Sequence, residues 1–398
     1  MRRNLWARGT SREDRDRVFS CVVTRSFVEQ GQAGRTDVTM FIGVCGSICA
    51  GKRTIARYLV DHHGFTQLFL DIRASDGVND GTDGVVFPSN SNGSPYGSDS
   101  PPNPQHIFSA PGDLLDFVTK HWRERWVTTD IHSEAILDLY ARRPFFLLLS
   151  VDAPLTVRWR RYQARQQQLL TTTTAAGAAA TKQKTFESFV ALSDGHLYDP
   201  ARGAHPLLSR ASVRLLNTSD SLAHLHAALG GVDLLARERL RPSWDAYFMA
   251  LASLAAQRSN CMKRRVGCVV VRDKRVISTG YNGTPRGLPN CGEGGCARCN
   301  AGDGSGHGLA TCLCIHAEEN ALLEAGRERL RDGAVLYCDT CPCLTCSIKI
   351  VQVGVGEVVY NHGYSMDGDT AAVFREAGVK LRQFVPPANG LIHLERLE

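Results

Sequence analysis

The stretch VLYCDTCPCLTC, residues 335–346, starts as a short apolar strand and ends with Cys343 and Cys346, three positions apart after a proline. The residues that follow have helical spacing as far as Val353, so the sequence predicts a strand that leads directly into a helix. Cys343 and Cys346 would then lie on one face of the first helical turn. By itself, such a pair also fits a structural zinc knuckle or a redox pair.

A second motif, His316-Ala317-Glu318, lies upstream, where another helix is predicted to begin. One histidine and two cysteines give Zn²⁺ three protein ligands and leave the fourth tetrahedral position open to water, which is typical of catalytic zinc. Zinc lowers the pKa of such a water to about 7. Glu318 is not expected to bind the metal, and its carboxylate can carry a proton from the water to a ring nitrogen and to leaving ammonia. The order His-x-Glu, then Pro-Cys-x-x-Cys, is typical of zinc nucleobase deaminases.

Composition limits the classes of protein to consider. The chain has 398 residues, enough for two domains, and an apolar fraction of 43% that supports packed cores. It has no apolar run long enough to span a bilayer, so we expect no membrane association. A net charge of +6 suits small phosphorylated ligands and is too mild to indicate a nucleic-acid-binding protein.

Cysteine usage is more informative than charge. Of the 14 cysteines, 11 fall between Cys261 and Cys346. The Arg-rich N-terminal stretch contains acids and lacks the apolar core of a secretory signal. In a reducing compartment clustered cysteines favour metal sites over disulfides. We therefore expect metal binding and a cytoplasmic location, with the nucleus as a second compartment.

Strands alternate with helices after Arg241, which predicts an α/β domain over 241–398 with helices on the faces of a sheet. A helix is expected at 243–259, followed by two strands joined by a polar turn and then a Gly/Cys-rich loop over 283–314. The remaining elements are predicted as strands at 266–271, 276–281, 335–338, 357–360 and 380–384, and helices at 317–325, 343–353 and 370–377.

Residues 40–235 are predicted to form another α/β domain, because GSICAGKRT (46–54) separates a strand at Phe41–Cys45 from a helix. Backbone N–H groups and Lys52 of such a Gly-rich loop can hold phosphates, so Gly46, Gly51 and Lys52 are candidate phosphate ligands. The hydroxyl residue expected directly after the lysine, which would hold Mg²⁺, is replaced by Arg53. Asp71 and Asp152 are the candidate acidic residues for binding Mg²⁺ or acting as a base. The loop resembles small nucleotide or dephospho-coenzyme A kinases. The departures favour a degenerate P-loop kinase-like domain over an active kinase, and such a domain either binds a nucleotide or serves only as a scaffold.

Low-complexity segments interrupt this first domain. We expect inserts at 75–104, rich in Gly, Ser, Asn, Asp and Pro, and at 166–184. Further strands are expected at 145–151 and 213–217. Residues 1–39 are predicted to be disordered or to be an extension of the gene model upstream of a start at Met40.

The second domain resembles the deoxycytidylate (dCMP) deaminase family in its fungal form, within the zinc-dependent cytidine and deoxycytidylate deaminases. The stretches that carry the resemblance are RSNC (258–261), RVG (265–267), STGYNGTPRG (278–287), HAEENA (316–321) and YCDTCPCLTC (337–346). The GYNGTP run distinguishes this family from other zinc deaminases.

The resemblance implies an α/β/α three-layer fold and hydrolysis of dCMP to dUMP and ammonia, which supplies thymidylate synthesis. It places Asn282 near the sugar and Tyr364 in contact with substrate. It also implies a hexamer, activation by dCTP, and inhibition by dTTP with Mg²⁺. Gly283, Thr284 and Arg286 belong to the loop that is the best candidate for the effector site, although a strand-end turn would need the same Gly and Pro residues.

The loop cysteines resemble a second, structural zinc site found in part of that family. Cys261 and Cys291 match best, and Cys296 and Cys312 are the next choices. Cys299, Cys314 and His307 are substitutes, and free surface thiols are the alternative. Four such ligands would close the coordination shell and pin a loop that cannot pack by itself. The others in this half, Cys268, Cys338 and Cys341, are expected in strands or turns.

Two other functions compete with a free-nucleotide deaminase. A polynucleotide deaminase needs a basic groove interleaved with aromatic residues, and we find neither a basic run nor an aromatic cluster beside the site motifs. A regulatory or bifunctional nucleotide-binding protein would rely on the first domain. Arg53 in the phosphate loop weakens this hypothesis, because it replaces the hydroxyl that would hold Mg²⁺.

Overall fold

The computed structural model describes residues 38–71, 106–172, 185–302, 307–330, 333–363, 367–385 and 390–394. Tyr364, the insert predicted at 75–104 and all but the last two residues of the 1–39 extension lie outside these ranges. Thr39–Glu398 forms one compact unit, to which the following description applies. None of the helices in the described ranges is long and apolar enough to cross a bilayer.

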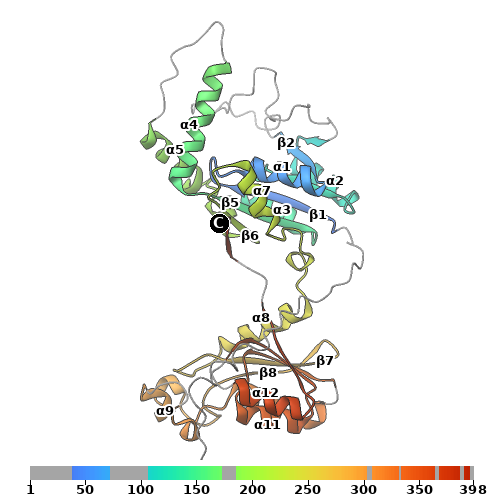
Figure 1. Ribbon diagram of the computed structural model, residues 1–398, viewed down its shortest axis with the longest axis vertical. Coiled ribbons are helices and arrows are strands. Elements are labelled where there is room, and N and C mark those ends of the chain that lie inside the picture. The colour runs from blue at the N-terminus through green and yellow to red at the C-terminus, as the bar shows by residue number, and fades with distance from the viewer. Residues whose placement is uncertain are drawn as a thin grey trace, which may run out of the picture. The chain divides into compact units, whose positions relative to one another are not determined.

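A parallel sheet of seven strands, in the order β12-β6-β5-β1-β4-β2-β3, is built around β1 (Figure 1). Strand β1, Met40–Gly46, is buried at every position, as its nearly continuous apolar sequence predicts for a central strand covered on both faces. The strands predicted at 41–45, 145–151 and 213–217 are confirmed. The other strands are β2 Thr66–Leu70, β3 Ile107–Phe108, β4 Arg125–Thr128, β5 Phe146–Asp152, β6 Val213–Asn217 and β12 Leu391–Leu394.

Among the described residues, seven helices accompany this sheet. Apolar residues of α2, α3 and α6, among them Leu114, Tyr140 and Leu207, pack with Phe41 and Leu148 of the sheet into one core. The helices are α1 Lys52–His63, α2 Pro111–Lys120, α3 Glu134–Ala141, α4 Leu155–Thr172, α5 Phe186–Tyr198, α6 His205–Ser209 and α7 Leu222–Gly230. Helix α4 continues through Thr172, so the first part of the insert predicted at 166–184 is helical.

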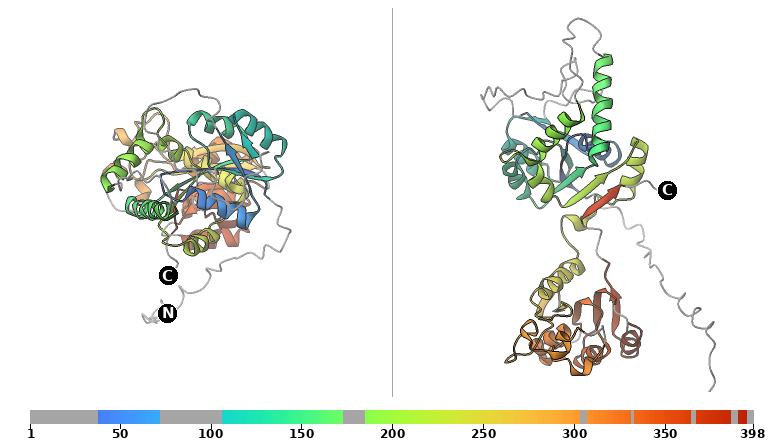
Figure 2. Two further views of the ribbon diagram at one scale, coloured as in Figure 1. Left: turned by 90° about the horizontal axis from the view of Figure 1, so that it is seen from above. Right: turned by 90° about the vertical axis from the view of Figure 1, so that its left-hand side faces the viewer.

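The last strand of the described residues, β12, belongs to the first sheet (Figure 2). Strand β12 pairs in parallel with β6, Leu394 is buried, and the Thr218 hydroxyl donates a hydrogen bond of 2.9 Å to the Leu394 carbonyl oxygen. The segment 241–398, predicted as one separate domain, therefore contributes its final strand to the sheet of the preceding region.

The second sheet has five strands in the order β11-β10-β9-β7-β8, and its helices form a layer on each face. Helix α8 covers one face through Phe248 and Met249, which pack against Val269 and Tyr337. Helices α10, α11 and α12 cover the other face in a separate core. The elements are α8 Trp244–Ala256, β7 Gly267–Arg272, β8 Arg275–Tyr281, α10 Ala317–Ala325, β9 Val335–Thr340, α11 Leu344–Val353, β10 Glu357–His362, α12 Asp367–Glu376 and β11 Lys380–Gln383.

The pairing within this sheet is mixed: β7 is antiparallel to β8 and β9, whereas β9, β10 and β11 are parallel. The predicted strands and helices of this region are confirmed with shifts of a few residues at their ends. Short helical turns complete the chain: η4 Arg237–Arg239, η5 Cys291–Glu293, α9 Ala297–Asn300, η6 Leu309–Thr311 and η7 Arg327–Arg329.

Candidate functional site

Two helix N-termini meet beyond the end of β9, the central strand of the second sheet. His316 occupies the N-cap position of α10, and Cys343, three residues after the end of β9, occupies that of α11. Helix α10 lies close against β8, because a Cβ atom at Gly280 would come within 2.2 Å of the Ala317 carbonyl oxygen. A glycine is therefore required at this crossing, which lies beside the first turn of α10.

The three predicted zinc ligands converge. The Nδ1 atom of His316 lies 3.4 Å from the sulfur of Cys343 and 3.4 Å from the sulfur of Cys346. Tetrahedral zinc, with bonds of about 2.3 Å to sulfur and about 2.05 Å to nitrogen, places such atoms roughly 3.6 Å apart. The donor set and its spacing thus fit one zinc ion and leave one coordination position without a protein ligand.

The electrostatics of this triad favour the thiolate that a metal ligand must be. Hydrogen bonding with Cys346, and then with His316, outweighs the effect of burial and lowers the pKa of Cys343 to about 3. The position of Cys343 at the start of α11 acts in the same direction, because a helix N-terminus stabilises negative charge.

Glu318 is 4% exposed, and it does not belong to the ligand cluster of His316, Cys343 and Cys346. Burial raises the pKa of its carboxyl to about 7, although the nearby His316 opposes the shift. A carboxyl group with a pKa near neutrality can both accept and donate a proton at physiological pH. This is the property that the sequence prediction required of Glu318.

A cavity of about 480 Å³ opens onto these residues. Its lining includes His316, Glu318 and Cys343, together with three cations that the sequence analysis did not identify: Lys263, Arg264 and Arg298. The expectation that no basic run lies beside the site is therefore wrong, because Lys263 and Arg264 of the run Lys263-Arg264-Arg265 line the cavity. The run is visible in the sequence, but it lies far along the chain from the two zinc motifs, and only the fold brings it to them.

Asn282 lines the same cavity, and its side chain is held firmly. The Oδ1 atom accepts hydrogen bonds from the Ser259 hydroxyl at 2.7 Å and the Val266 amide at 2.8 Å, and Nδ2 donates to the Arg264 carbonyl oxygen at 2.7 Å. Among the described residues, the second N–H of this amide has no hydrogen-bond partner, and Asn282 lines the cavity. Tyr364, the other predicted substrate contact, is outside the described residues.

The predicted effector residues lie in the loop that follows β8. Gly283 forms an isolated antiparallel β-bridge, with two backbone hydrogen bonds, to Ile315, the residue before His316. Thr284 donates its hydroxyl to the Pro289 carbonyl oxygen at 2.9 Å, and Arg286 is exposed. None of the three predicted effector residues is among the residues that line the cavity.

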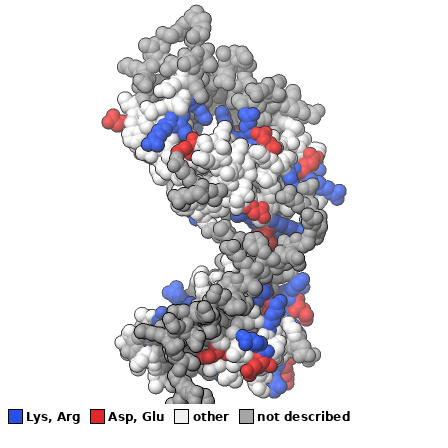
Figure 3. Space-filling model, viewed as in Figure 1, with Lys and Arg blue, Asp and Glu red and all other residues white. Residues whose placement is uncertain are grey.

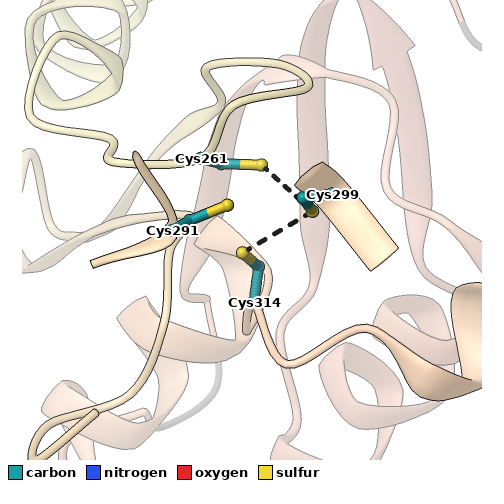
Figure 4. Close-up of side chains that lie close together, drawn as sticks. All are labelled: Cys261, Cys291, Cys299 and Cys314. Atoms are coloured by element: carbon teal, nitrogen blue, oxygen red, sulfur yellow. Dashed lines mark hydrogen bonds between the residues drawn. The ribbon is translucent and has the colours of Figure 1, made fainter. Parts of the chain in front are cut away.

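The loop cysteines gather beside the cavity in two overlapping groups of four. Cys261 and Cys291 group with Cys299 and Cys314, whereas Cys296 and Cys312 form a second group with the same two residues. Figure 4 shows the first group. The four residues predicted as one zinc site thus do not form a single group, since Cys299 and Cys314, which had been substitutes, belong to both.

The other predicted positions fall elsewhere. In the described part of the chain, His307 belongs to no metal-binding group. Cys268 and Cys338 face each other across the β7–β9 pair, as expected for strand residues, and Cys341 follows β9.

The predicted phosphate loop connects β1 to α1. Gly46 and Gly51 have φ angles of 155° and 112°, and Lys52 is the first residue of α1. The Lys52 ammonium donates to the Gly46 carbonyl oxygen at 3.0 Å, and burial lowers its pKa. Arg161 donates to the Ala50 carbonyl oxygen at 3.1 Å. The loop has the predicted position, and its lysine is already engaged within the protein.

Comparison with known proteins identifies similar chains. The family described as "Cytidine and deoxycytidylate deaminase zinc-binding region" matches residues 242–362. Deoxycytidylate deaminase of Schizosaccharomyces pombe is 45% identical over 351 residues, which cover 88% of this chain and 99% of the relative. The Saccharomyces cerevisiae deoxycytidylate deaminase is 45% identical over 355 residues, covering 87% and 96%. Among solved structures, the dCMP deaminase of cyanophage S-TIM5 in complex with dCMP and dUMP is 33% identical, covers 35% of this chain and 94% of its own, and gives a TM-score of 0.29.

Proposed function

The chain belongs to the deoxycytidylate deaminase family, a family of zinc-dependent hydrolytic deaminases, and from this we propose that it converts dCMP and water to dUMP and ammonia. The dUMP supplies dTMP synthesis, in the cytoplasm or nucleus. One observation carries the proposal: the buried carboxyl of Glu318 lies with His316, Cys343 and three cations around one cavity.

His316, Cys343 and Cys346 would hold a zinc ion, which when bound would lower the pKa of a water and so supply a nucleophile. The water oxygen forms a bond with C4 of the cytosine ring while Glu318 accepts a proton from that water. Glu318 then delivers the proton to N3 of the ring. It then carries a second proton from the added hydroxyl to the amino group, and the C4–N4 bond breaks. One water is consumed and one ammonia is released, and Glu318 returns to its starting state.

The cations explain why the substrate would be a nucleotide. A 5′-phosphate carries about two negative charges near pH 7, and Lys263, Arg264 and Arg298 line the cavity that holds the proposed reaction centre. The remaining N–H of Asn282 can donate to the sugar, and Tyr364 stays a predicted substrate contact. The site should therefore discriminate dCMP from deoxycytidine through charge-assisted hydrogen bonds to the phosphate.

Regulation is proposed on the resemblance, with dCTP as activator and dTTP as inhibitor, each with Mg²⁺, at a site that includes Gly283, Thr284 and Arg286. The exposed guanidinium of Arg286 and the bridge that joins Gly283 to the residue before His316 support this assignment. Turnover measured with each effector, in the wild type and in Arg286→Gln, tests it. Loss of both responses in a variant with normal basal turnover is expected.

We propose a homo-oligomer, with a hexamer as the expected size. Several large apolar side chains on the helices of the second sheet are exposed, which supports contacts between copies. They are Trp244, Tyr247, Leu254, Leu323 and Ile348. Light scattering of the purified chain measures the assembly, and a monomer at all concentrations would contradict it.

The first sheet is proposed to carry a degenerate phosphate loop without kinase activity. The strand–loop–helix order at the centre of a parallel sheet supports descent from a nucleotide-binding site. The replacement of a metal-holding hydroxyl by Arg53, and the hydrogen bond from Lys52 to Gly46, support the loss of phosphoryl transfer.

Lys263 and Arg264, the basic residues that line the cavity, are one observation that favours a polynucleotide deaminase. On the face shown in Figure 3, however, the described Lys and Arg side chains are interspersed with Asp and Glu, whereas a polynucleotide-binding groove needs a continuous basic track. Ammonia release with dCMP, CMP, deoxycytidine and a cytosine-containing oligonucleotide, assayed side by side, separates the two functions. We expect dCMP to be the best substrate by at least ~10-fold, and preference for the oligonucleotide would overturn the proposal.

A further inference from the structure

Six cysteine side chains meet beside the cavity, more than one tetrahedral metal ion can bind. The six are Cys261, Cys291, Cys296, Cys299, Cys312 and Cys314. Their sulfur atoms form two groups of four, each compact enough for one ion, and the two groups share Cys299 and Cys314. In Figure 4 the four side chains of the first group point toward a common centre. We infer that the six thiolates bind two thiophilic divalent ions, zinc in the cell, with Cys299 and Cys314 bridging both.

The distances between sulfur atoms fit this arrangement. A tetrahedral zinc ion with bonds of about 2.3 Å places its sulfur ligands roughly 3.8 Å apart. The shared edge, Cys299 to Cys314, measures 3.9 Å. On one side of this edge Cys261 lies 3.8 Å from Cys299, and on the other Cys312 lies 3.6 Å from Cys299. The second terminal pair, Cys296 and Cys312, is 3.9 Å apart.

Each terminal pair also has the polar surroundings of bound thiolates. The Met262 amide donates to the sulfur of Cys291 at 3.4 Å, and the Leu313 amide donates to the sulfur of Cys296 at 3.4 Å. The Arg298 guanidinium lies 3.8 Å from the sulfur of Cys312. N–H groups directed at ligand sulfurs are the outer-shell contacts that orient and stabilise a metal centre.

A single zinc ion would bind only four of the six cysteines and leave two others close together without a metal. If it bound the first group, Cys296 and Cys312 would remain as two thiols at ligand spacing, one of them fully buried. If it bound the second group, Cys261 and Cys291 would be left in the same position. Two ions use all six sulfurs and give a cluster of net charge −2, because two Zn²⁺ ions offset four of the six thiolate charges. Lys263, Arg264 and Arg298 supply nearby positive charge.

The cluster would also hold part of the substrate cavity. Arg298, Cys299 and Cys314 all line it, and Cys314 is separated from His316 by one residue. Given the proposed function, loss of the cluster should raise the KM for dCMP more than it lowers kcat, because it loosens the loop that carries Arg298.

Elemental analysis of the purified full chain tests the metal count. We expect about three zinc ions per chain, one catalytic and two in the cluster. Cys312→Ser, which removes a terminal ligand, should hold about two, whereas Cys314→Ser, which removes a bridge, should hold about one. Cys49→Ser, in the loop after β1, is the matched control and should keep all three. Glu318→Gln should also keep all three while losing turnover, which separates the count from activity.

Cadmium-113 NMR of the substituted wild-type chain tests the bridges without any variant. Two signals from all-sulfur sites, coupled to each other through the shared thiolates, are expected. A wild-type zinc count of two, or two cadmium signals without coupling, would overturn the inference. A chain that binds three zinc ions but does not deaminate dCMP would refute the proposed function and support the cluster. A chain that deaminates dCMP but binds only two zinc ions would support the function and refute the cluster.

Discussion

Two regions of this chain present a helix N-terminus at the end of a strand, and they use their polar groups in opposite ways. At α10 and α11 the side chains of His316, Glu318 and Cys343 converge on an open cavity. At α1 the loop turns inward, where Lys52 donates to Gly46 and Arg161 donates to Ala50. The same local motif of strand, loop and helix thus leaves its polar groups open to a ligand in one region and engages them within the protein in the other.

The remaining contacts of the α1 loop deepen this contrast. The Nδ2 atom of Asn217 donates to the Ala50 carbonyl oxygen at 2.9 Å, and Ser47 hydrogen-bonds to Asp152, one of the two acidic candidates for holding Mg²⁺. A carboxylate occupied in this way is less available to a metal. These hydrogen bonds stabilise the loop as a connection within the first sheet.

Among the variants that test the comparison between the two regions, Glu318→Gln should have the largest effect on dCMP turnover. The amide preserves the shape of the side chain but cannot accept or donate the proton, so dCMP turnover should fall by at least ~10³-fold. The zinc content should not change, because Glu318 is not among the metal-binding group. Turnover within tenfold of the wild type would break the assignment of the proton carrier.

A smaller effect is expected from Arg264→Gln, which removes a cation from the cavity but leaves the reacting groups in place. A charge-assisted hydrogen bond to the phosphate is worth about 1.5–3 kcal/mol, so the KM for dCMP should rise roughly 10- to 150-fold. The weak activity with deoxycytidine should be unaffected, since that substrate has no phosphate. Arg327→Gln, at an exposed position outside the cavity lining, is the control. An equal loss with both substrates would indicate structural damage in place of phosphate recognition.

The first sheet should respond to changes in packing. Leu394 of β12 is 1% exposed and Leu391 of the same strand is 47% exposed. Leu394→Ala should lower the free energy of unfolding by about 2–5 kcal/mol, as buried leucine truncations do. Leu391→Ala, the control on the same strand, should change it by less than about 0.5 kcal/mol. Denaturant unfolding with a probe in the first sheet measures both, and equal effects would show that β12 does not pack there in solution.

The smallest effect is expected from Lys52→Met. If the α1 loop has lost phosphoryl transfer, the full chain should consume no ATP with Mg²⁺ and common nucleosides or nucleotides, and the variant should deaminate dCMP within about twofold of the wild type. ATP-dependent product formation that disappears in Lys52→Met would restore a second enzymatic activity. That result would also remove the contrast between the two regions.

Local patterns predicted most of the second sheet and its proposed site. The strand before Cys343, the helix after it and the His316–Glu318 motif are all short-range features, and each is found where the sequence places it. Hydrophobic periodicity and Pro or Gly boundaries determine such elements without knowledge of the tertiary fold.

Contacts between distant segments could not be predicted in this way. Lys263 and Arg264 precede β7 and reach the cavity only because β7 pairs with β9, the strand that leads to Cys343. The choice among the loop cysteines depended on how a Gly-rich loop folds back on itself, which has no periodicity. Strand β12 is four residues long, and its partner β6 precedes it by more than 150 positions.

Isotope-labelled water gives the most direct test of the central claim, that this chain hydrolyses dCMP. Purified, zinc-loaded protein is incubated with dCMP in ¹⁸O-enriched water, and the product is examined by mass spectrometry alongside an ammonia assay. The account predicts dUMP that carries one ¹⁸O at C4 and an equal amount of ammonia, with neither formed by Glu318→Gln. Unlabelled dUMP, or no conversion of dCMP by a chain that has its full zinc content, would contradict it.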